Sequence, residues 1–260
     1  MSELHDVFAR AKSENRAALI GYLPAGFPTR QGAVECLLAM IDGGVDIVEI
    51  GLPYSDPVMD GPTIQQAVEI SLSGGTKIPD VIDTVREVAA TGAPVLVMSY
   101  WNPIERFGVD RFASELVAAG GVGVITPDLT PEEAKAWIAT TDTHHADRVF
   151  LVALSSTNER IATVSSVTTG FVYAGAVMGV TGVRANLSDE VKNLVARVRP
   201  HTDLPVAVGL GVSTPEQAHD IAQYADGVIV GSAFVSAINS GGAAAARVLA
   251  QQLSAGLRRD

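Results

Sequence analysis

Short apolar runs alternate with longer amphipathic stretches along the whole chain. Eight runs are rich in Val and Ile and apolar at consecutive positions, at residues 18–22, 47–50, 95–99, 122–125, 149–154, 171–174, 206–208 and 228–230. A strand has this pattern when helices cover one face of its sheet and a packed interior covers the other. Stretches with helical periodicity lie between the runs, for example at 31–42, 110–119, 131–139 and 214–222. The pattern predicts eight strand-helix units and therefore a closed parallel barrel.

The length of the chain fits this architecture. With 260 residues and 47% hydrophobic content, the chain is long enough for one α/β barrel of about 250 residues. We expect a (β/α)8 barrel of the TIM type that takes up residues 1–260 as a single domain. An open doubly wound sheet is the alternative, but it usually has fewer strands and would leave the last units without a place. Leu4, Phe8 and Ala11 share one face of an amphipathic start, which predicts an extra N-terminal helix.

Charge and composition restrict the partners. The net charge of -11 and the pI near 4.8 argue against nucleic acid and anionic membranes, which both call for a basic surface. No apolar run has the length of a membrane span, and the polar start lacks the apolar core of a signal peptide, so we expect a cytoplasmic protein. The single cysteine, Cys36, lies in an apolar helical stretch and is expected to be buried.

The segment VEIGLPYSDPVMDGPTIQ at residues 48–65 places a carboxylate inside a predicted strand. Side chains alternate along a strand, so Ile47, Glu49 and Gly51 share one face. A carboxylate that faced the helix layer would be dry and unpaired, so we expect Glu49 to face the barrel mouth. Partial burial there should raise its pKa, which suits a group that both gives and takes a proton. An ion pair between Glu49 and a neighbouring arginine is the alternative.

Asp60 follows on the loop after the same predicted strand. Gly61-Pro62-Thr63 begins a helix, so Asp60 alone is equally well explained as a cap or a turn former. Its position on one loop with Glu49 favours an acid/base site at the carboxyl ends of the strands, where the turns into helices are long and rich in Gly and Pro.

Three glycine-rich loops follow the last strands of the predicted barrel. They contain Gly179-Val180-Thr181-Gly182, then Gly209-Leu210-Gly211 with the capping signature Ser213-Thr214-Pro215-Glu216, and then Gly231-Ser232. Backbone N–H groups at helix entries hold a phosphate without a cation. We therefore expect a phosphate site at the last strands.

Other kinds of catalysis lack their residues. None of the four lysines, Lys12, Lys77, Lys135 and Lys192, ends a predicted strand, so there is no candidate for a Schiff base. The histidines lack metal-ligand spacing, and neither a GxGxxG motif nor a Ser-His-Asp set is present, so we expect no metal site. Proton transfer by carboxylates on a phosphorylated substrate remains.

The order and spacing of VEIGLPYSDPVMDGPTIQ, Tyr173 with GVTG, GLGVSTPEQA and GVIVGSA resemble the α subunit of tryptophan synthase over nearly the whole chain. The resemblance implies retro-aldol cleavage of indole-3-glycerol phosphate to indole and glyceraldehyde 3-phosphate. Glu49 would protonate indole C3 and take the proton of the glycerol hydroxyl. Asp60 would accept the indole N–H and stabilise the positive charge on the ring, and Thr181 would hydrogen-bond Asp60 when its loop closes.

The resemblance also implies binding residues and a partner. Gly182, Gly211, Gly231 and Ser232 match the phosphate site. Tyr22, Met98, Ile125 and Tyr173 match residues around the indole, although the sequence alone favours a core position for the first three. Pro53, Asp56 and Pro57 match the loop that faces a β subunit in an α2β2 heterotetramer. The chain itself would need no cofactor, and pyridoxal phosphate would belong to the β subunit.

The chain departs from the family at two places. Family members often have Ser between the tyrosine and GVTG, where this chain has Ala174-Gly175-Ala176-Val177-Met178, and PDLP where it has Pro127-Asp128-Leu129-Thr130. Three alternatives stay open: a free-standing indole-releasing lyase, a barrel that acts mainly as an allosteric partner, and a sugar-phosphate isomerase with Glu49 as sole base.

Overall fold

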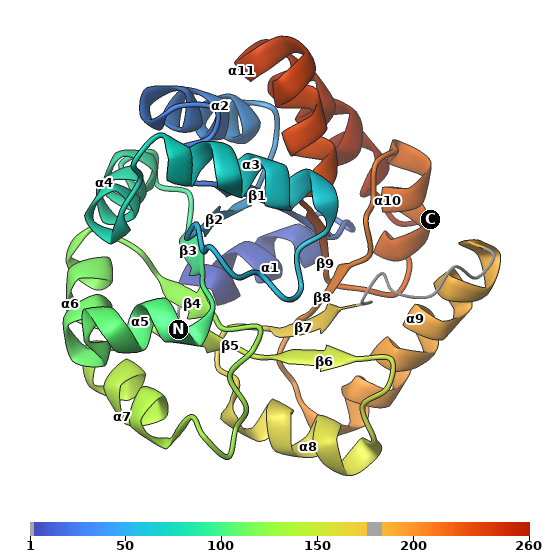
Figure 1. The fold of residues 1–260 in the computed structure, drawn as a ribbon. Helices are drawn as coiled ribbons and strands as arrows, with labels where there is room; N and C mark the ends of the chain where they lie inside the picture. Colours follow the sequence, from blue (N-terminus) through green and yellow to red (C-terminus); the bar gives the residue numbers. More distant parts are fainter. Residues whose placement is uncertain (1–2, 176–183) are drawn as a thin grey trace.

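The strands form one parallel sheet that curls into a barrel, with helices around it (Figure 1). The computed structural model describes residues 3–175 and 184–260. The strands in these ranges are β1 (Ala18–Pro24), β2 (Ile47–Gly51), β3 (Val95–Met98), β4 (Gly123–Ile125), β5 (Asp147–Val149), β6 (Leu151–Ala153), β7 (Val172–Gly175), β8 (Val206–Gly209) and β9 (Gly227–Val230). Their order in the sheet is β5-β4-β3-β2-β1-β9-β8-β7-β6.

The two ends of the sheet, β5 and β6, are consecutive in the chain. Only Phe150 separates them, and β5 pairs with β4 whereas β6 pairs with β7. The predicted strand at 149–154 is therefore wrong as one element, because this segment passes from one neighbour to the other and its ladder breaks at Phe150. The barrel fold that the sequence predicts is confirmed.

The helices surround the barrel, except for the first, whose apolar face packs against the interior side chains. They are α1 (Glu3–Ser13), α2 (Arg30–Asp42), α3 (Pro62–Ser73), α4 (Ile78–Ala89), α5 (Trp101–Phe107), α6 (Val109–Ala118), α7 (Lys135–His144), α8 (Asn158–Val167), α9 (Arg184–Val198), α10 (Pro215–Ala222) and α11 (Ser232–Gly256), with a short 3-10 helix at Arg199–His201. The predicted helix at 131–139 begins later, because the Glu133 N–H donates to the Thr130 carbonyl and residues 131–134 form turns.

Two apolar clusters divide the core. One lies between the strands and the surrounding helices, and the other fills the barrel interior. The interior cluster includes Leu4, Phe8 and Ala11 of α1, and the Phe8 ring lies 5.7 Å from the Phe171 ring. The predicted N-terminal helix is thus confirmed, and it packs against the barrel interior.

The long helix α11 packs against the barrel wall. Within the described ranges it is the one helix whose length and composition alone would allow it to cross a membrane. Gly241 and Gly242 have non-helical dihedral angles, so neither part reaches the roughly 20 residues that a span requires. Phe234, Ile238 and Leu253 are buried. The segment α11 thus consists of two shorter helical parts, each with buried side chains that pack in the outer apolar cluster.

The helix starts after the strands follow local sequence signals. Pro62 occupies the first turn of α3, as predicted. The capping box of α10 is formed by Thr214 and Gln217, one residue later than the predicted pair Ser213 and Glu216. These starts place the loop after β2, the loop after β8 and the N-terminus of α11 at the same end of the barrel.

Candidate active site

Glu49 lies in β2 and points into the barrel. Ile47 packs in the interior cluster, whereas Val48 and Ile50 pack in the outer cluster. Because side chains alternate along a strand, Glu49 shares the interior face with Ile47. In the ladder it lies opposite Tyr22 of β1 and Leu96 of β3. The predicted direction of this side chain is confirmed.

The carboxyl of Glu49 is almost completely removed from water. Its residue is 1% exposed, and Oε1 has no hydrogen-bond partner among the described residues. Burial raises its pKa to about 8, because desolvation disfavours the charged form. No arginine in the described ranges pairs with it. Glu49 is therefore a proton donor at neutral pH rather than half of an ion pair.

Asp60 is half-buried at the end of the loop that follows β2. Burial raises the pKa of its carboxyl, and the Tyr100 hydroxyl acts in the opposite direction. The pKa of Tyr22 is raised well above its ordinary value, first by burial and then by the charges of Asp60 and Glu49. Both carboxyl groups thus act on one phenol, which places them together at the mouth of the barrel.

Two tyrosine rings cover glycines on the interior face of the mouth. A Cβ at Gly51 would lie 2.3 Å from the Tyr22 hydroxyl oxygen. A Cβ at Gly209 would lie 2.5 Å from the Tyr173 hydroxyl oxygen. The charge of Glu49 also contributes to the raised pKa of Tyr173, after burial. These glycines leave room for the two phenols beside Glu49.

The opposite wall is formed by adjacent strands. Met98 of β3 lies in register with Gly51 on one side and Ile125 of β4 on the other. Ile125 is buried in the interior cluster, and Met98 packs against it. Tyr173 packs against the same cluster, and Tyr22 shares one face of β1 with Ile20 of that cluster, so the residues that the resemblance assigned to the indole all face the barrel interior.

Glycines of the expected phosphate site lie at the ends of two neighbouring strands, β8 and β9. Gly211 follows β8 with a φ of 65°, a left-handed conformation that favours glycine. Gly231 is the N-cap of α11 and Ser232 its first residue, and no side chain caps this helix. The first-turn N–H groups of α11 thus lack a side-chain cap. Thr181 and Gly182 lie outside the described residues.

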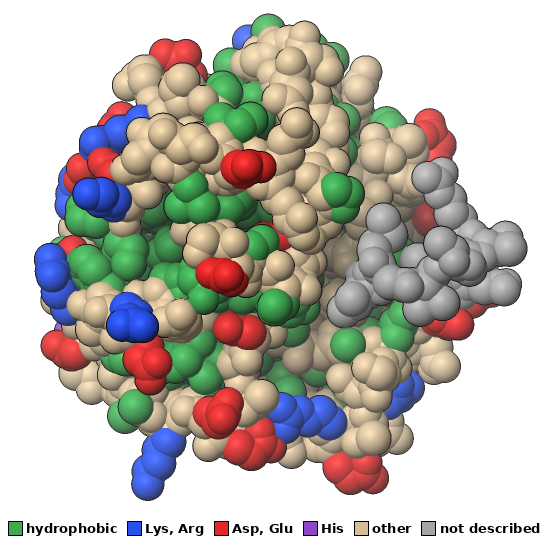
Figure 2. Space-filling model, in the orientation of Figure 1, with side chains coloured by type: hydrophobic (Ala, Val, Ile, Leu, Met, Phe, Trp, Pro, Cys, Tyr) green, Lys and Arg blue, Asp and Glu red, His purple; other side chains and the backbone are tan. Residues whose placement is uncertain are grey.

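The loop after β2 also presents apolar side chains outward. Val58 is 80% exposed and Met59 is 39% exposed. Asp56 is exposed and accepts a hydrogen bond of 2.6 Å from the Ser55 hydroxyl, Pro57 is partly exposed, and Pro53 is buried. The face seen in Figure 2 shows hydrophobic side chains gathered in the region of α3, α4 and α5.

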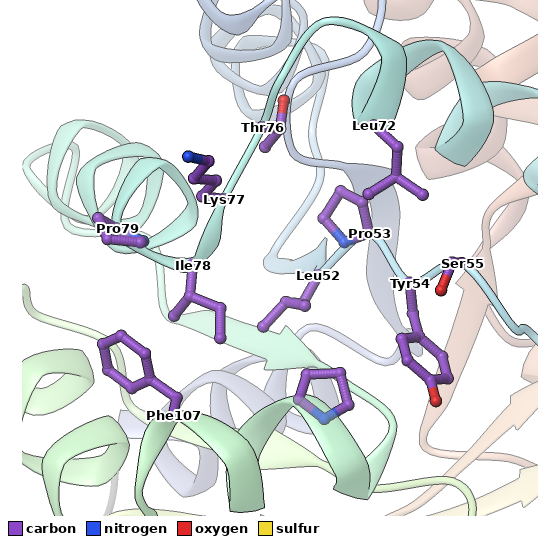
Figure 3. Close-up of a pocket in the computed structure, with 11 residues that line it drawn as sticks. Leu52, Pro53, Tyr54, Ser55, Leu72, Thr76, Lys77, Ile78, Pro79 and Phe107 are labelled. Atoms are coloured by element: carbon purple, nitrogen blue, oxygen red, sulfur yellow. The ribbon is translucent and has the colours of Figure 1, made fainter.

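A cavity of about 410 Å³ lies beside this loop. It is lined by Leu52, Pro53, Tyr54, Ser55, Leu72, Thr76, Lys77, Ile78, Pro79, Pro103 and Phe107. Figure 3 shows the side chains of Leu52, Ile78 and Phe107 around its centre. Neither Glu49 nor Asp60 lines it, so this apolar cavity is separate from the carboxyl pair.

The described part of the chain lacks the side-chain arrangements that metal-assisted, Schiff-base or thiol chemistry would use. No group of three His, Cys, Asp or Glu side chains there is arranged to hold a metal ion. Lys12, Lys77, Lys135 and Lys192 lie in helices or at helix starts, away from strand ends. Cys36 is buried, as predicted, and burial raises the pKa of its thiol to about 11, which keeps it protonated and unreactive.

Sequence reasoning missed Tyr100, which follows β3 at the mouth. Its hydroxyl accepts a hydrogen bond of 2.9 Å from the Met59 N–H and interacts with the Asp60 carboxyl. The signal was present, because a polar aromatic residue just after a barrel strand stands where functional residues gather.

Comparison with known proteins shows to which family this chain belongs. The family model for the tryptophan synthase alpha chain matches residues 8–258. This chain belongs to the tryptophan synthase alpha chain family. The α chain from Acidothermus cellulolyticus is 55% identical over 100% of this chain and 98% of its own length. The α chain from Nocardia farcinica is 53% identical over 99% of this chain and 96% of its own length.

Solved structures of tryptophan synthase agree with this assignment. The Mycobacterium tuberculosis structure in space group F222 has a TM-score of 0.95 and 50% identity, and the match covers 100% of this chain and 99% of that chain. The open form from the same organism with BRD0059 bound has a TM-score of 0.94 and 48% identity, with 100% of both chains covered. The resemblance seen in the sequence is confirmed along the whole chain.

Family membership fixes the activity of this α chain. It is a carbon-carbon lyase of tryptophan biosynthesis and cleaves indole-3-glycerol phosphate. It needs no cofactor of its own, since pyridoxal phosphate belongs to the β subunit, its partner in tryptophan synthase. Members of this family are soluble biosynthetic enzymes.

Proposed function

We propose that Glu49 and Asp60 carry out the cleavage of indole-3-glycerol phosphate together, Glu49 as general acid and base and Asp60 as acceptor of the indole N–H. One observation carries the proposal: a carboxyl that is 1% exposed, with a pKa of about 8, lies at the barrel mouth within the electrostatic reach of Tyr22, as does Asp60. A protonated buried acid and a half-exposed carboxylate are suited to different steps of one reaction.

The reaction then proceeds in two proton transfers. Glu49 gives its proton to C3 of the indole ring, and the Asp60 carboxylate stabilises the positive charge that develops at the ring nitrogen. The Glu49 carboxylate next takes the proton of the glycerol hydroxyl beside C3. The carbon-carbon bond breaks, the aldehyde forms, and the electron pair returns to the ring to give indole. Glu49 ends protonated, as it began, so two carboxyl groups suffice.

The rest of the mouth holds the substrate. Tyr22, Met98, Ile125 and Tyr173 would surround the indole, because they share the interior face with Glu49. Gly182, Gly211, Gly231 and Ser232 would bind the phosphate, which is supported by the lack of a side-chain cap on α11. Thr181 would hydrogen-bond Asp60 when the substrate is bound.

The loop with Pro53, Asp56 and Pro57 would face the β subunit. Val58 and Met59 support this orientation, because covering apolar side chains that are 80% and 39% exposed on one loop would remove apolar surface from water.

We also propose that residues 1–260 act as one barrel domain in the cytoplasm.

Glu49→Gln tests the catalytic assignment. Its amide keeps the shape of the side chain but neither gives nor takes the proton, so we expect cleavage to fall by roughly 10³-fold or more. Substrate binding, measured by equilibrium titration, should stay within a few-fold because the phosphate contacts are unchanged. Glu69→Gln on the exposed face of α3 is the matched control and should cleave normally. Normal turnover in Glu49→Gln would overturn the proposal.

Asp60→Ala tests the second carboxylate. We expect loss of cleavage, whereas an isomerase with Glu49 as sole base would tolerate this change. Rates with and without the β subunit address the free-standing lyase and the allosteric partner: a fast solitary enzyme favours the former, and no turnover in either case the latter.

A further inference from the structure

Tyr100 connects the loops that follow two neighbouring strands. It comes directly after Ser99 at the end of β3, it is 7% exposed, and it caps the N-terminus of α5. Its hydroxyl oxygen accepts the Met59 N–H at 2.9 Å. A phenol has one O–H to donate and two lone pairs, so this contact uses a lone pair and leaves the proton free. The Asp60 carboxyl, next to Met59 in the chain, is the acceptor that the hydroxyl meets.

Three further contacts keep Tyr100 in place. Its ring lies 5.5 Å from the ring of Tyr54, which belongs to the loop after β2. Both carboxylate oxygens of Asp128, from the loop after β4, accept the N–H of Trp101, at 2.9 and 3.1 Å. The Trp101 ring in turn packs edge-on against Trp137 of α7 at 5.7 Å. The backbone beside Tyr100, its ring and its hydroxyl are therefore each held by a different part of the barrel.

Tyr100 remains a proton donor at every working pH. Burial raises the pKa of its phenol to about 12, and the nearby charges of Asp60 and Asp128 act in the same direction. The hydroxyl interaction lowers the pKa of the Asp60 carboxyl and so opposes the effect of burial. A neutral donor that is aimed at a half-buried carboxylate favours its ionised form.

The geometry points to Tyr100 as the positioning residue of Asp60. Its hydroxyl oxygen accepts a hydrogen bond from the Met59 N–H, and its proton is donated to the Asp60 carboxylate. This carboxylate is thereby held ionised and oriented toward the indole N–H. This inference rests on the proposed role of Asp60. Tyr100 acts through Asp60, so its contribution is to the step in which positive charge builds on the ring nitrogen.

Tyr100→Phe in tryptophan synthase with its β subunit tests the inference. The variant keeps the ring beside Tyr54 and deletes the donor. We expect kcat for cleavage to fall about tenfold with little change in KM, because the carboxylate loses its orientation. The acid limb of the pH profile of kcat should move up by about one pH unit, because the charged form of Asp60 loses a hydrogen bond.

Tyr54→Phe is the matched control for this limb. It removes a hydroxyl from the same ring pair, but that hydroxyl accepts from the Asn102 Nδ2 at 2.9 Å rather than meeting Asp60. The acid limb should therefore stay where it is in the parent protein. An equal movement of the limb in both variants would overturn the inference, since a general loosening of the ring pair would then explain it.

Asp60→Asn separates this inference from the function on which it rests. If Asp60→Asn abolishes most cleavage and Tyr100→Phe leaves both kcat and the acid limb unchanged, Asp60 acts without Tyr100 and the positioning role is wrong. If Asp60→Asn cleaves normally, the proposed role of Asp60 fails first. In the double variant, Tyr100→Phe should add less than a twofold loss to Asp60→Asn, because its target has been removed.

Discussion

Burial of Glu49 should make the folded protein less stable as the pH rises. The folded carboxyl has a pKa of about 8, against an ordinary value of 4.5 in the unfolded chain. Between these values the folded state binds a proton that the unfolded state has released, so stability falls with increasing pH across this window. Glu49→Gln keeps the shape of the side chain and does not titrate, so it should escape this loss.

The size of the effect follows from the shift. One pKa unit corresponds to about 1.4 kcal/mol, so the ionisable Glu49 should cost about 3 kcal/mol of folding free energy at pH 7 and about 5 kcal/mol well above pH 8. At pH 5 the folded carboxyl is protonated and the cost should be below about 1 kcal/mol. The group is 1% exposed, so solvent screening reduces these values little.

Urea unfolding followed by Trp101 and Trp137 fluorescence measures this difference at pH 5, 7 and 9. Glu49→Gln should match the parent chain at pH 5 and exceed its stability at pH 7 and 9 by the amounts above. Glu69→Gln, an exposed change of the same kind, should show no such widening. A stability gain for Glu49→Gln that is equal at pH 5 and pH 9 would refute the reasoning.

Three further predictions concern the mouth of the barrel. kcat/KM for cleavage should decline as the pH rises through about 8, because Glu49 loses the proton that C3 requires, and a pH-rate profile that keeps rising beyond 8 contradicts this. Gly51→Ala should lower stability by about 1–3 kcal/mol and raise KM, because its Cβ would lie 2.3 Å from the Tyr22 hydroxyl oxygen; unchanged unfolding and steady-state kinetics would count against this packing. Gly211→Ala and Gly75→Ala, at φ values of 65° and 83°, should each cost about 1 kcal/mol in an unfolding assay. Only Gly211→Ala should raise KM, and an equal KM for both would argue against a phosphate site at Gly211.

Periodicity was enough to predict the barrel and the direction of Glu49. A period of two leaves one choice of face for each residue of a short strand, and a carboxylate on the helix side of β2 would have no partner. The break between β5 and β6 was not predictable in this way, because both halves are apolar and the change of neighbour at Phe150 depends on how the sheet closes. The late start of α7 reflects a turn at Thr130 that outcompetes the helix.

The candidate site was predictable where chemistry and chain order coincide. Asp60 shares a loop with Glu49, so their proximity follows from local sequence. Tyr100 contacts Met59 and Asp60, which both lie on the loop after another strand, so its place just after β3 marked it as a candidate but its partners could not be read from its own segment. Thr181 and Gly182 stay predictions from the resemblance to the family.

A crystal structure of the Glu49→Gln variant with indole-3-glycerol phosphate tests the central assignment most directly. The account predicts an uncleaved substrate, with C3 of the indole beside the side chain of residue 49, the ring N–H on Asp60 and the phosphate at the N-terminus of α11. Cleaved products in that crystal, or an indole ring bound away from both carboxyl positions, would contradict it.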